Sequence, residues 1–210
     1  MKIETITVGP FESNCYIVSN SASEALIIDP GDNADLVIDR VKAGQFSVCA
    51  ILITHGHIDH VSALADVHRA FPSPVAMHPL DASWAFQSLN QMMPYYAPPR
   101  APSEISRKLA DGQSWTDAGF QYEIIETPGH SPGSVSFYFR EENTLFSGDA
   151  LFNGSVGRVD LPGGDAHVLN NTLQRLAELP EDTRVYPGHG PSTTIGHEKN
   201  SNPFMIHGMV

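Results

Sequence analysis

Alternating apolar and polar positions, together with several short apolar runs, predict a chain rich in β-strands. The strands expected from this pattern are Lys2–Val8, Asn14–Ser19, Ala25–Asp29, Ser47–Ile53, Pro74–Met77, Arg107–Leu109, Phe120–Thr127, Ser134–Arg140, Thr144–Phe146 and Arg184–Tyr186. The first two are joined through Gly9-Pro10, and the first three favour an antiparallel meander. The strand Ser47–Ile53 is almost continuously apolar, which is typical of a strand buried on both faces.

Four segments have the apolar spacing or the end signals of helices. They are Ala34–Lys42, Val61–Ala70, Pro79–Leu89 and Ala166–Glu178. Asp32 and Asp165 are the expected N-caps of the first and last of these, because a short polar side chain there accepts from free backbone N–H groups. The apolar face expected for the first helix is Leu36, Val37, Ile38 and Val41. The face expected for the last is Val168, Leu169, Leu173, Leu176 and Ala177.

The segment 90–102 mixes prolines with Met and Tyr. One interpretation is an irregular surface connection. The other is a substrate-covering loop or an interface patch, since Met and aromatic side chains make adaptable apolar contacts. No element is predicted for 195–210.

Length and composition indicate a single domain over residues 1–210, with 41% hydrophobic and 17% charged residues. No apolar run approaches the roughly 18 residues of a membrane span. The N-terminus alternates like a strand and lacks the apolar region of a signal peptide. We therefore expect a cytoplasmic protein without a membrane partner.

The net charge is −12, and an acidic surface argues against a nucleic-acid partner. Part of that charge belongs to carboxylates that a bound cation would neutralise. The two cysteines, Cys15 and Cys49, lie in apolar strand patterns and are interpreted as small buried residues, neither disulfide-bonded nor nucleophilic.

The segment Thr54–His60 places four metal-ligand side chains directly after an apolar strand. They are His55, His57, Asp59 and His60. Imidazole nitrogens and carboxylate oxygens bind zinc and similar divalent metals. Three further loops follow predicted strands and contain His130, Asp149 and His189 beside glycines, which let backbone loops pack closely around a small centre. All four loops follow carboxyl ends of strands, so they are expected to converge on one edge.

Seven ligands suit two metals if one carboxylate bridges them. We assign the first metal three histidines, namely His55, His57 and His130. We assign the second Asp59, His60 and His189. Asp149 is the expected bridge, together with water or hydroxide. Of the remaining histidines, His78 and His197 are the candidates for contacting a metal-binding side chain without binding the metal themselves.

At these residues the chain resembles the metallo-β-lactamase superfamily, whose signature His-x-His-x-Asp-His is followed by a distant His, Asp and His. Strand and helix order alone predicts α/β or α+β; the resemblance implies an α+β fold, the four-layer αββα sandwich. Within the superfamily the chain is most similar to short bacterial glyoxalase II-like (hydroxyacylglutathione hydrolase-like) enzymes. The segments that carry this similarity are 148–152, 157–160, 188–191, Glu198 and 202–204.

The resemblance implies hydrolysis of thioesters such as S-lactoylglutathione. A hydroxide held by two metals would attack the thioester carbonyl, and Asp59 would orient it. Arg158 is a candidate for binding a substrate carboxylate, and the alternative is a structural ion pair with Asp160 or Asp165. Phe152 is a second candidate substrate contact, at a position where lactone hydrolases commonly have Tyr.

The resemblance also implies limits. The C-terminal helical domain with which full-length glyoxalase II contacts glutathione is expected to be absent, which leaves the thiol open. β-Lactamase activity is not expected, because one branch of those enzymes has Cys where Asp149 stands. One alternative is a persulfide dioxygenase-like enzyme with a single iron. The other is a non-catalytic metal-binding or interaction module. Zinc is the expected metal, with iron and manganese as alternatives; the oligomeric state is left open.

Overall fold

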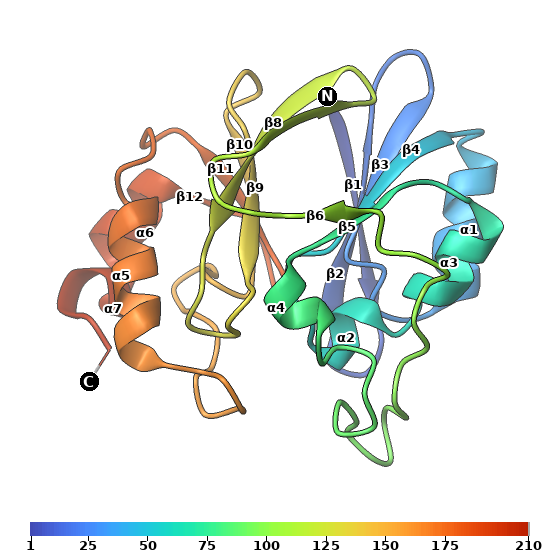
Figure 1. The fold of residues 1–210 in the computed structure, drawn as a ribbon. Helices are drawn as coiled ribbons and strands as arrows, with labels where there is room; N and C mark the ends of the chain where they lie inside the picture. Colours follow the sequence, from blue (N-terminus) through green and yellow to red (C-terminus); the bar gives the residue numbers. More distant parts are fainter. Residues whose placement is uncertain (210) are drawn as a thin grey trace.

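The computed structural model describes residues 1–209, which form two six-stranded sheets flanked by helices (Figure 1). The strands are β1 (Lys2–Val8), β2 (Ser13–Ser19), β3 (Glu24–Ile28), β4 (Ser47–Leu52), β5 (Val75–Met77), β6 (Arg107–Lys108), β7 (Ser114–Asp117), β8 (Phe120–Glu126), β9 (Val135–Phe139), β10 (Thr144–Gly148), β11 (Arg184–Pro187) and β12 (Thr193–Thr194). The helices are α1 (Ala34–Ala43), α2 (Ile58–Val61), α3 (Leu64–Ala70), α4 (Pro79–Ala82), α5 (Ala166–Leu176), α6 (Ile195–Ser201) and α7 (Pro203–His207).

Each sheet mixes antiparallel and parallel pairs. In the first, β1, β2 and β3 are antiparallel neighbours, as expected, and β3, β4, β5 and β6 continue in parallel. In the second, β7 to β10 are antiparallel, β11 joins β10 in parallel, and β12 closes the edge. The parallel strands have their carboxyl ends at the same edge, which is where ligand loops can meet.

Three buried clusters separate the layers. Ile17 and Ile27 pack under α1 and α3, whereas their strand neighbours Val18 and Leu26 point between the sheets. A third cluster, which includes Leu173 of α5, lies between the second sheet and that helix. Each fully buried side chain of this size contributes roughly 1.5–3 kcal/mol. The predicted α+β four-layer αββα sandwich is confirmed, with α1 and α3 on one outer face and α5 to α7 on the other (Figure 1).

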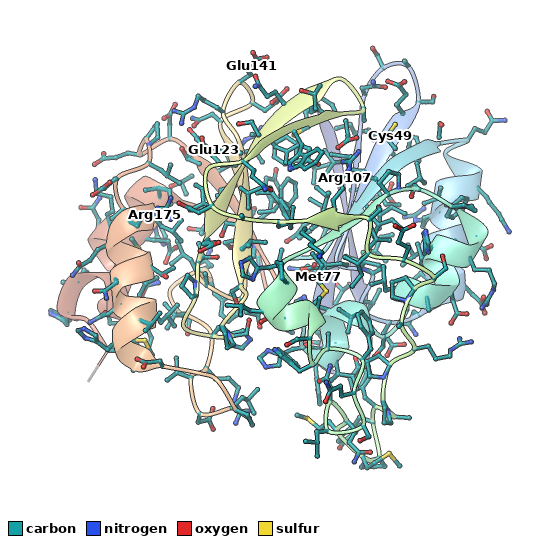
Figure 2. All side chains as sticks on the ribbon, viewed as in Figure 1. Cys49, Met77, Arg107, Glu123, Glu141 and Arg175 are labelled. Carbon is teal, nitrogen blue, oxygen red and sulfur yellow. The ribbon has the colours of Figure 1, made fainter. Side chains whose placement is uncertain are left out.

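An ion pair also joins the two sheets. Arg107 of β6 donates to both carboxylate oxygens of Asp117 on β7, at 2.5 and 3.0 Å. The pair is largely buried, and hydrogen bonding to Asp117 raises the pKa of Arg107. Side chains fill the space between the two halves, with Arg107 above and Met77 at the junction of β5 and α4 (Figure 2).

Two predicted helices are interrupted by polar contacts. The expected helix over 61–70 begins earlier and breaks between α2 and α3, because the Ala63 N–H bonds to Pro30 O outside the helix. The expected helix over 79–89 ends as α4 at Ala82. Asn90 Nδ2 donates to Ala85 O at 2.6 Å and Gln87 Nε2 donates to Ser83 O at 2.5 Å, so side chains replace helical partners there.

The start of α1 also corrects the prediction. Asp32 is not the N-cap; Asn33 takes that position, and Asp32 Oδ1 accepts from the Asn33 N–H instead. Leu36 is exposed, because Val37 and Val41, one turn apart, form the buried stripe. The N-cap Asp165 of α5 is confirmed by its bonds from the N–H groups of His167 and Val168.

Several short elements were not predicted. β7 and β12 have four and two residues, too few for alternation to be visible, so Arg184–Tyr186 is not the last strand. The helices α6 and α7 occupy the region without a prediction. Within 90–102 the structure has only an isolated bridge between Met92 and Tyr96. None of the helices within residues 1–209 has the length and apolar character needed to cross a bilayer.

Candidate metal centre

The four predicted ligand loops come from both sheets. The loop after β4 contains His55 and His57, and the short helix α2 that follows it contains Asp59 and His60. The other three side chains follow β8, β10 and β11; they are His130, Asp149 and His189. All seven lie together at one edge of the sandwich, as the strand pattern predicted.

The first proposed group has three imidazoles around one point. His57 Nδ1 lies 2.7 Å from His130 Nε2. The ring of His55 lies 5.0 Å from that of His57 and 4.9 Å from that of His130, centroid to centroid. One ligand atom from each of the three lies within 4.8 Å of the others, which a single metal ion can bridge.

The second proposed group combines a carboxylate with two imidazoles. Asp59 Oδ2 lies 3.2 Å from His189 Nε2 and 3.6 Å from His60 Nε2. The two Nε2 atoms are 3.4 Å apart. This set also meets the spacing of one metal site.

Asp149 lies between the two groups. Its Oδ2 is 3.4 Å from His130 Nε2 of the first group and 3.5 Å from His189 Nε2 of the second. Its Oδ1 is 3.4 Å from His60 Nε2. Gly188 packs so closely on this carboxylate that a side chain there would collide with Oδ1. Asp149 thus lies within 3.5 Å of an imidazole of each group.

Backbone carbonyls set the orientation of two imidazoles. His130 Nδ1 donates to Arg158 O at 2.7 Å, and His189 Nδ1 donates to Phe11 O at 3.0 Å. A carbonyl only accepts, so each Nδ1 carries the hydrogen and each Nε2 lone pair faces Asp149.

The Asp29 carboxylate orients the imidazoles of His55 and His60, the first of them through Thr54. This buried carboxylate accepts from the Thr54 N–H at 2.8 Å and from the Thr54 hydroxyl at 2.5 Å, and lies 3.1 Å from His60 Nδ1. Because the hydroxyl donates to Asp29, its oxygen accepts from His55 Nδ1 at 3.0 Å. Asp29, His55 and His60 also have metal-site spacing. The Asp29 oxygens are already engaged, so we interpret this carboxylate as a support for the two imidazoles.

Two imidazoles of the first group, His55 and His57, are poor proton acceptors. Burial, followed by the charges of neighbouring imidazoles, lowers the pKa of His55 well below its usual range. Burial and the adjacent His130 lower the pKa of His57 to about 3. Both rings are therefore neutral at pH 7, which is the form that binds metal.

The second group holds compensating charge. Burial disfavours the imidazolium of His60, but Asp59, Asp149 and Asp29 outweigh it and raise the pKa of His60 to about 10. Burial alone would raise the pKa of Asp59, but His60 and His189 outweigh burial and lower this pKa below its usual range. A cation is thus favoured at this position, and a divalent ion in place of the proton satisfies the same carboxylates.

Two buried atoms show where an ion fits. His55 Nε2 and Asp149 Oδ1 have no hydrogen-bond partner among residues 1–209, although both are shielded from solvent. A buried polar atom without a partner costs about 1–3 kcal/mol. Both atoms belong to the proposed ligand set, so the nitrogen and oxygen donors fit divalent metals at this position.

Asp81 is a supporting residue that the sequence reasoning missed. Its fully buried carboxylate accepts from the Gly56 N–H at 2.7 Å, the Ser131 hydroxyl at 2.6 Å and the Gly133 N–H at 2.7 Å. It therefore ties the loop after β4 to the loop that contains His130. Its place in the first turn of the predicted helix 79–89 gave no sign of burial, because acidic residues are common at that position.

Other candidate residues lie around the centre. His78 caps α4 and contacts Glu126 at 3.1 Å, and His197 is exposed; within residues 1–209 neither forms a hydrogen bond or ion pair with a proposed ligand. Arg158 forms a two-pronged exposed pair with Asp160, at 2.6 and 2.7 Å. The Phe152 ring lies edge-on to His189, 5.9 Å between centroids. The ion pair expected as one alternative for Arg158 is present, and its substrate role stays a prediction.

Comparison with known proteins agrees with this geometry. Residues 8–189 match the profile of the metallo-beta-lactamase superfamily. The hydroxyacylglutathione hydrolase GloC of Haemophilus influenzae is 35% identical over 208 residues, which cover 98% of each chain.

Two solved structures are similar over nearly their whole length. The B3 metallo-beta-lactamase BLEG-1 is 39% identical with a TM-score of 0.92, covering 98% of this chain and 100% of its own. TTHA1623 in a di-iron-bound form is 42% identical with a TM-score of 0.87, covering 96% and 99%. The fold, the seven converging side chains and these matches agree: the chain belongs to the metallo-beta-lactamase superfamily.

Proposed function

We propose that this protein hydrolyses thioesters of the S-lactoylglutathione type at a centre of two divalent metals. The observation that carries the proposal is the position of Asp149 between two complete ligand groups. The hydroxyacylglutathione hydrolase activity named for the Haemophilus influenzae relative supports the thioester class.

The proposed division of labour follows from the contacts above. The first metal is assigned to His55, His57 and His130. The second is assigned to Asp59, His60 and His189. Bound metals supply Lewis-acid polarisation of a carbonyl and lower the pKa of coordinated water to about 7.

Asp59 is proposed to orient the nucleophile. Its carboxylate is ionised at neutral pH, so it accepts a hydrogen from an attacking water and aims the oxygen lone pair at the carbonyl. No side-chain nucleophile is needed, because a thiolate with a conjugate-acid pKa near 8.5 leaves readily. Phe152 is proposed to shield the second group from bulk water beside His189.

Zinc is the proposed metal because its ligands are typically imidazole and carboxylate. The di-iron form of TTHA1623 makes iron the first alternative, and manganese the second. The proposed partner is a small thioester, with no nucleic acid and no membrane, and the proposed location is the cytoplasm.

β-Lactam hydrolysis is a second candidate because of the similarity to BLEG-1. The same two groups and the same Asp59 would serve it, since both reactions add hydroxide to an acyl carbonyl. The sequence-based expectation that this activity is absent stays a prediction.

Metal analysis combined with a substrate panel tests the proposal. We expect close to two metals per purified chain, hydrolysis of S-lactoylglutathione, loss of activity after chelation and recovery on adding zinc. The panel includes glutathione persulfide with an oxygen electrode and nitrocefin as a β-lactam. Metal-dependent oxygen uptake without thioester hydrolysis would support the dioxygenase alternative, and a chain that binds no metal would support the non-catalytic module.

A prediction follows for Arg158. We expect the Arg158 guanidinium to leave Asp160 and bind a substrate carboxylate. Arg158→Ala should then raise KM for S-lactoylglutathione about fivefold and leave kcat unchanged, because losing one exposed ion pair weakens binding by about that factor. The free energy of unfolding should change by less than about 0.5 kcal/mol, because the pair with Asp160 is exposed.

The matched control is Arg140→Ala, which removes a similarly exposed Arg–Glu pair at the opposite end of β9 from the His130 loop. Steady-state kinetics with a carboxylate-free thioester provide the second comparison. An equal KM for wild type and Arg158→Ala on S-lactoylglutathione would leave Arg158 only its structural ion pair.

A further inference from the structure

Exposed apolar side chains gather in one segment beyond α4. Eight large hydrophobic residues are exposed among residues 1–209, and four of them fall within seven positions: Leu89, Met92, Met93 and Tyr95. Leu89 is 88%, Met93 67% and Tyr95 61% exposed. We call residues 84–96 the apolar segment. This concentration differs from the scattered single exposures that are normal on a protein surface.

The apolar segment starts against the first ligand group. The Trp84 ring lies 5.3 Å from the His57 ring, centroid to centroid. Asn90 Nδ2 donates to the carbonyl of Gly56 at 2.9 Å. Gly56 stands between two proposed ligands, and a side chain there would press on the Trp84 ring. The segment is therefore anchored directly to the loop after β4.

The same segment ends against the second ligand group. The rings of Tyr95 and Tyr96 lie 5.7 and 5.3 Å from the ring of Phe11. The carbonyl of Phe11 accepts from His189 Nδ1. The segment thus runs from a ligand of one metal group to a support of the other, along one side of the centre.

A closed turn holds the tip outward. The Met92 N–H donates to Tyr96 O at 3.0 Å, and the Tyr96 N–H donates to Met92 O at 2.9 Å. Tyr96 is buried, so it anchors the turn, while Met93 and Tyr95 remain in solvent. The backbone bonds therefore hold Met93 and Tyr95 largely in solvent, although the Tyr95 ring lies beside that of Phe11.

The chemistry around the centre favours an apolar occupant. Phe152 lies against His189 and Trp84 against His57, so aromatic rings flank both groups. Arg158 is a cationic residue at the centre, because its backbone carbonyl accepts from His130. Its guanidinium is already paired with Asp160. Met side chains are flexible and adapt to hydrocarbon surfaces of varied shape.

We propose that the apolar segment, chiefly Met93 and Tyr95, is the binding wall for the acyl group of the substrate, and that the acyl groups it selects are hydrocarbon chains or rings. This inference rests on the thioesterase function proposed above and extends its substrates from the lactoyl group to more apolar acyl groups. A second copy of this chain is the competing occupant, and the experiment distinguishes the two.

Binding of S-alkylglutathiones tests the wall without requiring catalysis. These thioethers, from S-methyl to S-decyl, replace the scissile carbonyl by a methylene, and their Kd is measured by calorimetry on the metal-loaded protein. We expect Kd to fall about two- to fourfold per added methylene, where fourfold corresponds to full burial of that methylene. The decrease should stop once the alkyl chain covers the apolar segment. Hydrolysis of the matching S-acylglutathiones is measured in parallel, and kcat/KM should rise with the same slope.

The double variant Met93→Ser/Tyr95→Ser should abolish the chain-length dependence of Kd. Both side chains are exposed, so the variant should fold; Leu36→Ser, an exposed leucine of α1 outside the segment, is the control that keeps the slope. A wild-type Kd that is independent of chain length, or an equal slope in the double variant, would overturn the inference. A change in oligomeric state by sedimentation with the slope intact would assign the segment to a second copy instead. Absence of thioester hydrolysis with the binding slope present would refute the proposed function and not the wall.

Discussion

Replacing Asp149 with asparagine is expected to lower kcat/KM for the thioester by on the order of 1,000-fold and to reduce the metal content below two per chain. The physical reason is charge. Asp149 approaches an imidazole of each group within 3.5 Å, and an amide of the same shape supplies only one neutral acceptor oxygen. Without a shared anion, two dications a few ångströms apart repel each other in a poorly solvated site.

Metal content by mass spectrometry and steady-state kinetics on the same samples check this expectation. Asp39→Asn on the exposed face of α1 removes the same charge far from the ligand loops, and should retain two metals and full activity. Far-UV circular dichroism establishes that Asp149→Asn is folded. Two metals with wild-type activity in Asp149→Asn would remove the bridging role and leave the centre as two independent sites.

The convergence of the seven side chains could be predicted because it depends on local patterns. The ligands follow the ends of four strands, β4, β8, β10 and β11, each of which the apolar pattern predicts. Side chains placed after the carboxyl ends of strands that run in the same direction meet at one edge, whatever the details of the loops between them. The alternation of Ile27 and Leu26 between two cores likewise gives the layers without any knowledge of distant contacts.

The supports of the centre could not be predicted in the same way. Asp29 occurs in Asp29-Pro30-Gly31, a sequence that reads as a turn, and its partner Thr54 is 25 positions away. Asp81 bonds to groups 25 and 50 positions away. A carboxylate in a turn or in the first turn of a helix is usually exposed, and only the packing of the two sheets buries these two.

The helix errors have a related cause. Residues 79–89 have acceptable helix propensity, but the side chains of Gln87 and Asn90 take backbone carbonyls that a continuous helix would use. This interruption produces the apolar segment. Its composition marks it as unusual, but the sequence does not predict that it lies beside His57 and near the support of His189. Propensity is a weak prior where a tertiary contact such as Asn90 with Gly56 competes with it.

The largest stability effect is expected from Asp81→Ala, which should lower the free energy of unfolding by about 3–5 kcal/mol. Asp81 is fully buried and accepts three hydrogen bonds, two from backbone N–H groups and one from a hydroxyl. Truncation leaves the Gly56 N–H, the Gly133 N–H and the Ser131 hydroxyl without their acceptor. Each such buried donor costs about 1–3 kcal/mol, partly offset because the carboxylate itself no longer has to be desolvated.

Urea unfolding of chelator-treated protein, followed by tryptophan fluorescence, measures this loss without a contribution from bound metal. Asp81→Asn keeps one acceptor oxygen and should fall between wild type and Asp81→Ala. Asp35→Ala, an exposed acidic residue of α1, is the matched control and should change stability by less than about 0.5 kcal/mol. Because Asp81 joins the loop after β4 to the His130 loop, the metal-loaded Asp81→Asn protein should also bind the first metal more weakly, by roughly 10- to 100-fold. A loss below about 1 kcal/mol in Asp81→Ala, with metal affinity unchanged in Asp81→Asn, would mean that the two ligand loops hold their positions without this carboxylate.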